Sequence, residues 1–352
     1  MNSIRAKKIF AAITVLLLVF TLSVTAFAEN GALQTELIPG GMAFGVKFFT
    51  EGAIVLGTTG VNTASGVVSP AKDAGLRAGD IIIRAGGSVF ESASELTDII
   101  SGSGGKQIVI AYMRNGVEQT ATVTPARDSE NGCFRIGVFV RDSTAGIGTV
   151  TFIDPITLAF GGLGHGIYDS ETSVLLPLLR GAVVDVEITD VVKSYPNSPG
   201  ELRGNFGKVV AGSLYSNTEQ GVFGAFNSLP KTERKPIPVA SRAEVCEGDA
   251  SVLTTLSDGG IKEYSVRIEQ IYSSSGSTKN FLIKVTDNDL VAKTGGIVQG
   301  MSGSPILQNG KLVGAVTHVL VNEPTLGYGI FIENMLNSAE KAAKKSSLEC
   351  AA

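Results

Sequence analysis

The chain has 352 residues, of which 43% are hydrophobic and 18% are charged, and its formal net charge is −4. This balance supports sizeable hydrophobic cores, and it excludes a nucleic-acid-binding protein because phosphate recognition needs a dense basic face. The two histidines and three cysteines form no cluster of the kind that zinc requires, so we expect no metal and no cofactor. The cysteines allow at most one intramolecular disulfide; they are Cys133, Cys246 and Cys350.

Residues 1–28 have the pattern of a secretory leader. Three basic residues, Arg5, Lys7 and Lys8, precede an apolar run that ends in small residues at Ala26-Phe27-Ala28. The 20 residues from Ile9 to Ala28 are also long enough to cross a hydrocarbon layer of about 30 Å. We therefore expect export across the cytoplasmic membrane, with residues 1–28 either a cleaved signal peptide or a retained membrane anchor.

Residues 40–126 are predicted to form a compact α+β module. The pattern predicts short helices over Ser69 to Leu76 and over Ser92 to Ser101, a strand from Gly79 to Ile83, and a hairpin across Asn115-Gly116. The order of elements and the stretch from Ser69-Pro70-Ala71 to Gly79-Asp80 resemble a PDZ domain of the bacterial protease type.

The PDZ resemblance implies a groove that binds a peptide as an added strand, with an apolar-Gly-apolar loop receiving its terminal carboxylate. Phe44, Gly45 and Val46 are expected to be that loop, and Leu96 and Ile100 to border the groove. Periodicity alone also allows Leu96 and Ile100 to be core residues only.

From Cys133 to about Asn334, short strands alternate with turns rich in Gly, Pro, Ser and Asn. The expected strands include Ala182 to Ile188, Lys208 to Leu214 and Glu263 to Ile271. This pattern predicts a mainly β barrel or sandwich over residues 133–334. Residues 335–352 are predicted to be a C-terminal helix and tail.

Histidine is the commonest general base in hydrolases, and this chain has only two. His165 lies in a glycine-rich run from Gly161 to Asp169, which core packing explains poorly, so it is the predicted base. His318 lies in a predicted strand after the Asn309-Gly310 turn. We interpret His318 as a cleft-wall residue or a structural residue, and it is the alternative candidate for the base.

Gly300-Met301-Ser302-Gly303-Ser304-Pro305 has the pattern of the nucleophile loop in trypsin-like serine proteases. A hydroxyl nucleophile needs a tight turn, a neighbouring base and N–H groups directed at the developing oxyanion. Gly300 and Gly303 permit such a backbone around Ser302, and by analogy the N–H groups of Gly300 and Ser302 form the oxyanion hole. The alternative reading is an ordinary glycine- and serine-rich corner.

A third catalytic member would be a carboxylate that orients the imidazole. The spacing along the chain does not single one out, because several aspartates lie at strand ends or in turns. The candidates are Asp169, Asp185, Asp190, Asp287 and Asp289.

Four segments together resemble the stage IV sporulation protein B (SpoIVB) peptidases of endospore-forming bacteria: Gly164-His165-Gly166, Val285-Thr286-Asp287, Gly300 to Ile306, and Gly314 to Val319. The resemblance implies a trypsin-like double β-barrel over residues 133–334. It also implies a His, Asp, Ser triad, which falls on His165, Asp287 and Ser302. In the wider trypsin-like pattern the Asp follows the His within the first barrel, whereas Asp287 lies close to Ser302 along the chain.

The same resemblance implies an exported serine endopeptidase acting between forespore and mother cell. It would cleave a membrane-associated regulator, and so activate an intramembrane protease and a sigma factor, and it would also process itself. The implied partners are protein or peptide substrates and a PDZ ligand. Two other hypotheses remain: a non-catalytic PDZ scaffold, and a quality-control protease of broad specificity.

Overall fold

The computed structural model describes residues 35–272 and 277–349 of the chain. The predicted leader, residues 1–28, and Cys350 lie outside the described residues. Within the described part no helix is long and apolar enough to cross a membrane. Cys133 and Cys246 are both free and exposed.

The structure is mainly β, as predicted. One large sheet contains strands of the peptidase region and its N-terminal side: β1 (Glu36–Pro39), β2 (Ala43–Thr58), β10 (Val138–Ile153), β11 (Ala159–Gly162), β12 (Leu178–Val192), β13 (Glu201–Thr218), β14 (Gly221–Phe226) and β15 (Ile237–Pro238). The strand order is β15-β1-β10-β11-β14-β13-β12-β2, followed by β5 (Ile81–Ala85), β6 (Ile108–Arg114) and β7 (Val117–Val123), and β10 also pairs with β2. That extra pairing closes β2, β10, β11, β14, β13 and β12 into a ring, the first barrel.

The second barrel is closed in the order β16-β17-β18-β21-β20-β19. Its strands are β16 (Gly248–Thr255), β17 (Ile261–Ile271), β18 (Phe281–Val285), β19 (Pro305–Gln308), β20 (Lys311–Val319) and β21 (Leu326–Phe331). The helices of this region are η1 (Arg242–Glu244), α4 (Asn288–Thr294) and α5 (Ile332–Glu349). Two six-stranded closures in sequence confirm the predicted double-barrel architecture.

The PDZ module lies between the first two long strands of the chain. Its elements are β3 (Val61–Thr63), β4 (Gly66–Val68), α2 (Pro70–Asp73), β5 (Ile81–Ala85), α3 (Ala93–Gly102), β6 (Ile108–Arg114), β7 (Val117–Val123), β8 (Ala126–Arg127) and β9 (Phe134–Arg135). Ser92 caps α3 by accepting a hydrogen bond from the N–H of Glu95. Ile82, Leu96 and Ile110 are buried together in its core.

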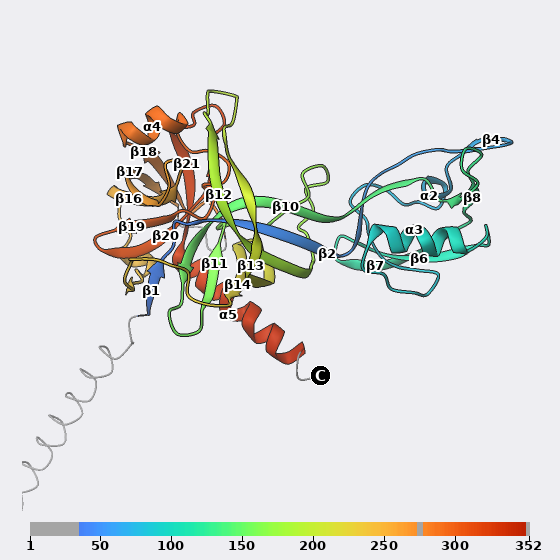
Figure 1. The fold of residues 1–352 in the computed structure, drawn as a ribbon, viewed down its shortest axis with the longest axis horizontal. Helices are drawn as coiled ribbons and strands as arrows, with labels where there is room; N and C mark the ends of the chain where they lie inside the picture. The colour runs from blue at the N-terminus through green and yellow to red at the C-terminus, as the bar shows by residue number, and fades with distance from the viewer. Residues whose placement is uncertain (1–34, 273–276, 350–352) are drawn as a thin grey trace, which may run out of the picture. The chain divides into compact units, whose positions relative to one another are not determined.

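Two long strands belong to both modules, and Figure 1 shows β2 and β10 running side by side. The first half of β2 pairs with β12 and β10 in the first barrel, whereas Ala53 and Ile54 pair with β5 of the PDZ module. Residues 43–49, which the expected boundary of 40–126 assigns to the PDZ module, therefore pair with strands of the peptidase region.

Candidate active site

His165 lies on a loop that leaves β11 at Gly162. Leu163 and Gly164 both have left-handed backbone, with φ of 66° and 67°. A Cβ on Gly164 would lie 2.9 Å from Thr317 Cγ2 and 3.1 Å from Ile330 Cγ2, both in the second barrel. Glycine at this position therefore lets the loop of His165 lie directly against β20 and β21.

Ser302 lies on a turn between α4 and β19, flanked by Gly300 with φ 97° and Gly303 with φ 94°. A Cβ on Gly303 would lie 2.0 Å from the Thr149 carbonyl oxygen and 2.5 Å from the Leu163 nitrogen. The turn is also held by Thr149, whose N–H donates to Ser302 O at 2.9 Å and whose hydroxyl donates to Gly300 O at 2.8 Å. The nucleophile loop thus packs on the segment that leads into His165.

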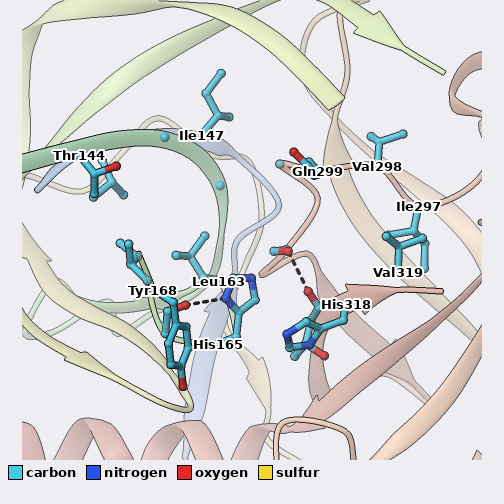
Figure 2. A pocket seen from close by; sticks show the side chains of 18 of the residues that line it. Thr144, Ile147, Leu163, His165, Tyr168, Ile297, Val298, Gln299, His318 and Val319 are labelled. Carbon is cyan, nitrogen blue, oxygen red and sulfur yellow. Dashed lines mark hydrogen bonds between the residues drawn. The ribbon is translucent and has the colours of Figure 1, made fainter. Parts of the chain in front are cut away.

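The two loops form the walls of one cavity of about 530 Å³. His165, Ser302 and His318 all line it, and so does Gly300. Other parts of the wall come from β10, from residues 297–299 and from Val319. The cavity therefore brings together the predicted base, the predicted nucleophile and the predicted oxyanion-hole residues. Figure 2 shows His165 and His318 in it.

The Ser302 hydroxyl donates a hydrogen bond of 2.8 Å to the Thr317 carbonyl oxygen. In the described part of the chain, no hydrogen bond engages the backbone N–H of Gly300 or of Ser302. Two free N–H groups beside a serine on a tight turn are what an oxyanion hole requires.

The imidazole of His165 is oriented by a backbone carbonyl. Its Nδ1 lies 2.8 Å from Gly166 O, and since a carbonyl oxygen only accepts, Nδ1 carries the proton. Burial lowers the pKa of His165, and the Gly166 carbonyl opposes that effect. At neutral pH the ring is therefore neutral, with the lone pair of Nε2 free to take a proton.

His318 lies beside His165, with 5.0 Å between ring centroids and 37° between ring planes (Figure 2). Burial, together with the charges of His165 and Lys279, lowers the pKa of His318 to about 4. We expected a cleft-wall residue, and the structure places His318 in the cavity wall in ring contact with the base.

Asp287 does not line the cavity, and the structure does not bring it to His165. It caps α4, where its Oδ1 accepts the N–H groups of Asp289 and Leu290 at 2.9 and 3.0 Å. Its Oδ2 accepts the N–H of Ser265 at 3.2 Å. Burial acts to raise the pKa of Asp287, but the hydrogen bonds from these N–H groups outweigh it, so the pKa is lowered. In this structure Asp287 is therefore the helix cap of α4, and its role in the expected triad stays a prediction.

None of the competing aspartates lines the cavity either. Asp169, four residues after His165, is buried and forms an ion pair of 2.5 Å with Arg141. Its other oxygen accepts the N–H groups of Glu171 and Thr172. Asp169 therefore holds the end of the His165 loop on β10 without reaching the imidazole.

The residues predicted to form the PDZ carboxylate loop lie elsewhere. Phe44 and Val46 are buried in the first barrel, with Phe160 and Leu163 in the same core, and Val46 lines the catalytic cavity. Leu96 is fully buried in the PDZ core, in a different cluster. The structure therefore separates Phe44, Gly45 and Val46 from Leu96 and Ile100, which corrects the predicted groove.

A second cavity, of about 240 Å³, lies in the PDZ module against α3. It is lined by Ile100 and Thr97 of α3 and by residues 134–139, where Ile136-Gly137-Val138 repeats the apolar-Gly-apolar pattern. Gly137 has φ 74°, and a Cβ there would lie 2.3 Å from Thr59 O. The same apolar-Gly-apolar pattern thus occurs twice in the chain, and the copy beside α3 is Ile136-Gly137-Val138.

The double barrel and the cavity that joins a serine on a glycine turn to a histidine define a serine peptidase of trypsin-like fold, preceded by a PDZ domain. The chain belongs to the SpoIVB peptidase S55 family, whose profile matches residues 132–336, more than half of its length. The PDZ domain profile matches residues 54–124.

Parts of the chain are similar to individual proteins. A putative zinc metalloprotease of Lactococcus lactis is 31% identical over 135 residues, which are 38% of this chain and 29% of that protein. The PDZ domain of an SdrC-like protein from Listeria monocytogenes is 28% identical, with a TM-score of 0.21, over 26% of this chain and 87% of that one. The Rv3671c protease of M. tuberculosis is 16% identical, with a TM-score of 0.31, over 56% of this chain and 74% of that one.

Proposed function

We propose that this protein is an exported serine endopeptidase that cleaves a membrane-associated regulatory protein in sporulation signalling, and that it processes itself. The observation that supports the peptidase activity is the close packing of Gly303 on Leu163, because Ser302 and His165 then line one cavity. Family membership supports the signalling role, and the leader pattern of residues 1–28 supports export.

In the proposed reaction, the Ser302 hydroxyl exchanges its acceptor, Thr317 O, for Nε2 of His165. It then attacks the substrate carbonyl while His165 takes its proton. The N–H groups of Gly300 and Ser302 stabilise the oxyanion, and His165 returns the proton to the leaving amine. The Gly166 carbonyl holds the Nδ1–H tautomer throughout, which is the task of the carboxylate in a Ser-His-Asp triad.

The PDZ module is proposed to bind a peptide between α3 and the start of β10. Val138 and Phe139 of β10 pair with β2 on one edge, and Phe139 is 61% exposed. The Ile136-Gly137-Val138 loop lines the cavity of about 240 Å³ beside α3, and it is the proposed receptor of the peptide's terminal carboxylate.

Intact-mass measurements on purified wild-type protein and the Ser302→Ala variant test the function. We expect fragments from defined self-cleavage positions in the wild type and an uncut variant. A non-catalytic scaffold would give identical masses. Incubation with an unfolded casein separates the remaining alternative, because a quality-control protease would degrade it extensively, whereas a dedicated signalling peptidase would leave most of it intact.

A further inference from the structure

The proposed reaction assigns no role to one half-buried titratable group of the cavity, His318. His318 lies near the end of β20, where it pairs with Tyr328 of β21, and its ring contacts that of His165. Its Nδ1 is buried and has no hydrogen-bond partner among the described residues. A buried polar atom without a partner costs free energy, so Nδ1 does not hold the ring in place, and the ring interaction that remains in the cavity is the contact with His165.

The base itself is oriented by little else. Within the described ranges, the ring of His165 makes one hydrogen bond, and the acceptor is the carbonyl of the next residue along the same loop. Among the described residues that line the cavity there is no carboxylate, and Asp287 caps α4. The contact with His318 comes from the second barrel, which also carries Ser302, so it fixes the imidazole relative to the nucleophile's own barrel.

We propose that His318 is a positioning residue, which holds the ring of His165 in its catalytic orientation through the contact between the two imidazoles. The inference rests on the proposed function. When His165 takes the proton of Ser302, the neutral ring of His318 lies 5.0 Å from the new cation, centroid to centroid, a distance at which a neutral aromatic ring can attract a cation.

This role requires a neutral His318. The groups that face it are His165 from the loop after β11, Lys279 from the segment before β18, and Tyr328 from β21. Lys279 lies 5.1 Å above the Tyr328 ring, and its charge opposes protonation of His318. A protonated His318 would repel the protonated base. Because its surroundings lower its pKa to about 4, His318 stays neutral at neutral pH.

A fluorophosphonate probe tests the proposal without a known substrate. Ser302 Oγ bonds to phosphorus, fluoride leaves, and His165 accepts the hydroxyl proton, so the labelling rate reports the activated nucleophile. The full chain would be measured as wild type, His318→Phe, His318→Ala and the matched control Leu320→Ala, which shortens a side chain just beyond the same strand. Ser302→Ala sets the background, and thermal unfolding checks each fold.

We expect His318→Phe to label within about 3-fold of the wild type because it keeps a ring against His165. His318→Ala should label about 10- to 100-fold more slowly, as expected for a misplaced catalytic group. Its rate-pH midpoint should also move to higher pH, because the newly exposed His165 regains a more ordinary pKa. Leu320→Ala should behave as the wild type.

Three results would overturn the proposal. One is a His318→Ala rate within about 2-fold of the wild type with an unchanged midpoint. Another is equal slowing in the Phe and Ala variants, which would assign the effect to the lost ring nitrogens. The third is labelling that survives His165→Ala but not His318→Ala, which would make His318 the base. Labelling of Ser302→Ala at the wild-type rate would instead refute the proposed function.

Discussion

Gly303 lies against the backbone of Leu163 so closely that a Cβ on Gly303 would be 2.5 Å from the Leu163 nitrogen. The two residues are 140 positions apart, and each is within two residues of a catalytic group: Gly303 follows Ser302, and Leu163 precedes His165. This backbone contact between the two barrels, rather than any hydrogen bond between side chains, joins the nucleophile to the base.

Gly303→Ala should therefore abolish labelling of Ser302 by the fluorophosphonate. The new Cβ would meet Thr149 O at 2.0 Å, and φ 94° is strained for alanine, so one loop must move. Gly310→Ala is the matched control, because Gly310 has φ 74° but no atom within 4 Å of the added Cβ. The control should lose about 1 kcal/mol of stability and keep its labelling rate. Normal labelling of Gly303→Ala would contradict the packed interface.

Asp287→Asn separates a helix cap from a triad acid. Asparagine can still accept the N–H groups of Asp289 and Leu290 through Oδ1, so we expect a labelling rate within about 3-fold of the wild type. A triad acid would instead lose about 10⁴-fold, because its amide would select the wrong tautomer of the base.

Asp287→Ala should lower the free energy of unfolding by about 1 kcal/mol, since it removes the cap of α4. Urea unfolding measures this loss. If the Asp287→Ala protein is stably folded but Ser302 is no longer labelled, Asp287 is a catalytic residue.

The acid sensitivity of stability should depend on His318. Its pKa is lowered from 6.5 to about 4, so between these values the unfolded chain binds more protons than the native chain. Stability then falls as the pH falls from about 6.5 toward 4, and this contribution is absent in His318→Phe. We expect urea unfolding at pH 7 and pH 4.5 to show a smaller loss in the variant. His165 shifts in the same direction in both proteins, so equal losses would contradict the lowered pKa of His318.

Phe139→Asp should weaken peptide binding by the PDZ module. Phe139 is exposed on β10 and lines the cavity beside α3, so a charge there opposes an apolar ligand. We expect about 10-fold weaker binding of an apolar peptide with a free C-terminus, measured by fluorescence anisotropy. Ile156→Asp is the control, at a site 89% exposed and outside the cavity. If a peptide amide binds as well as the free acid, the carboxylate loop at residues 136–138 is not the receptor.

Sequence reasoning succeeded where the signal is local. The hairpin turns at Asn115-Gly116 and Asn309-Gly310 adopt the positive φ values that their residues favour. Ser92 begins a helix, and the glycines around Ser302 form the expected turn. Each of these features depends on the backbone preferences of two to six neighbouring residues.

Sequence reasoning failed where the answer depends on which segments meet. The apolar-Gly-apolar pattern occurs at residues 44–46 and 136–138, and only the pairing of β2 with β12 shows that the first copy belongs to the barrel. The sequence also does not show that the carboxylate of Asp287 accepts three backbone N–H groups in the folded chain, one of them from Ser265. The contact between the two histidines joins the two barrels, and no local pattern encodes it.

The most direct test of the central claim is the intact mass of the wild-type, Ser302→Ala and His165→Ala proteins after exposure to the fluorophosphonate. The account predicts one adduct on the wild type, located at Ser302 by peptide mapping, no adduct on Ser302→Ala, and strongly slowed labelling of His165→Ala. An adduct at another residue, or equal labelling of all three proteins, would contradict it.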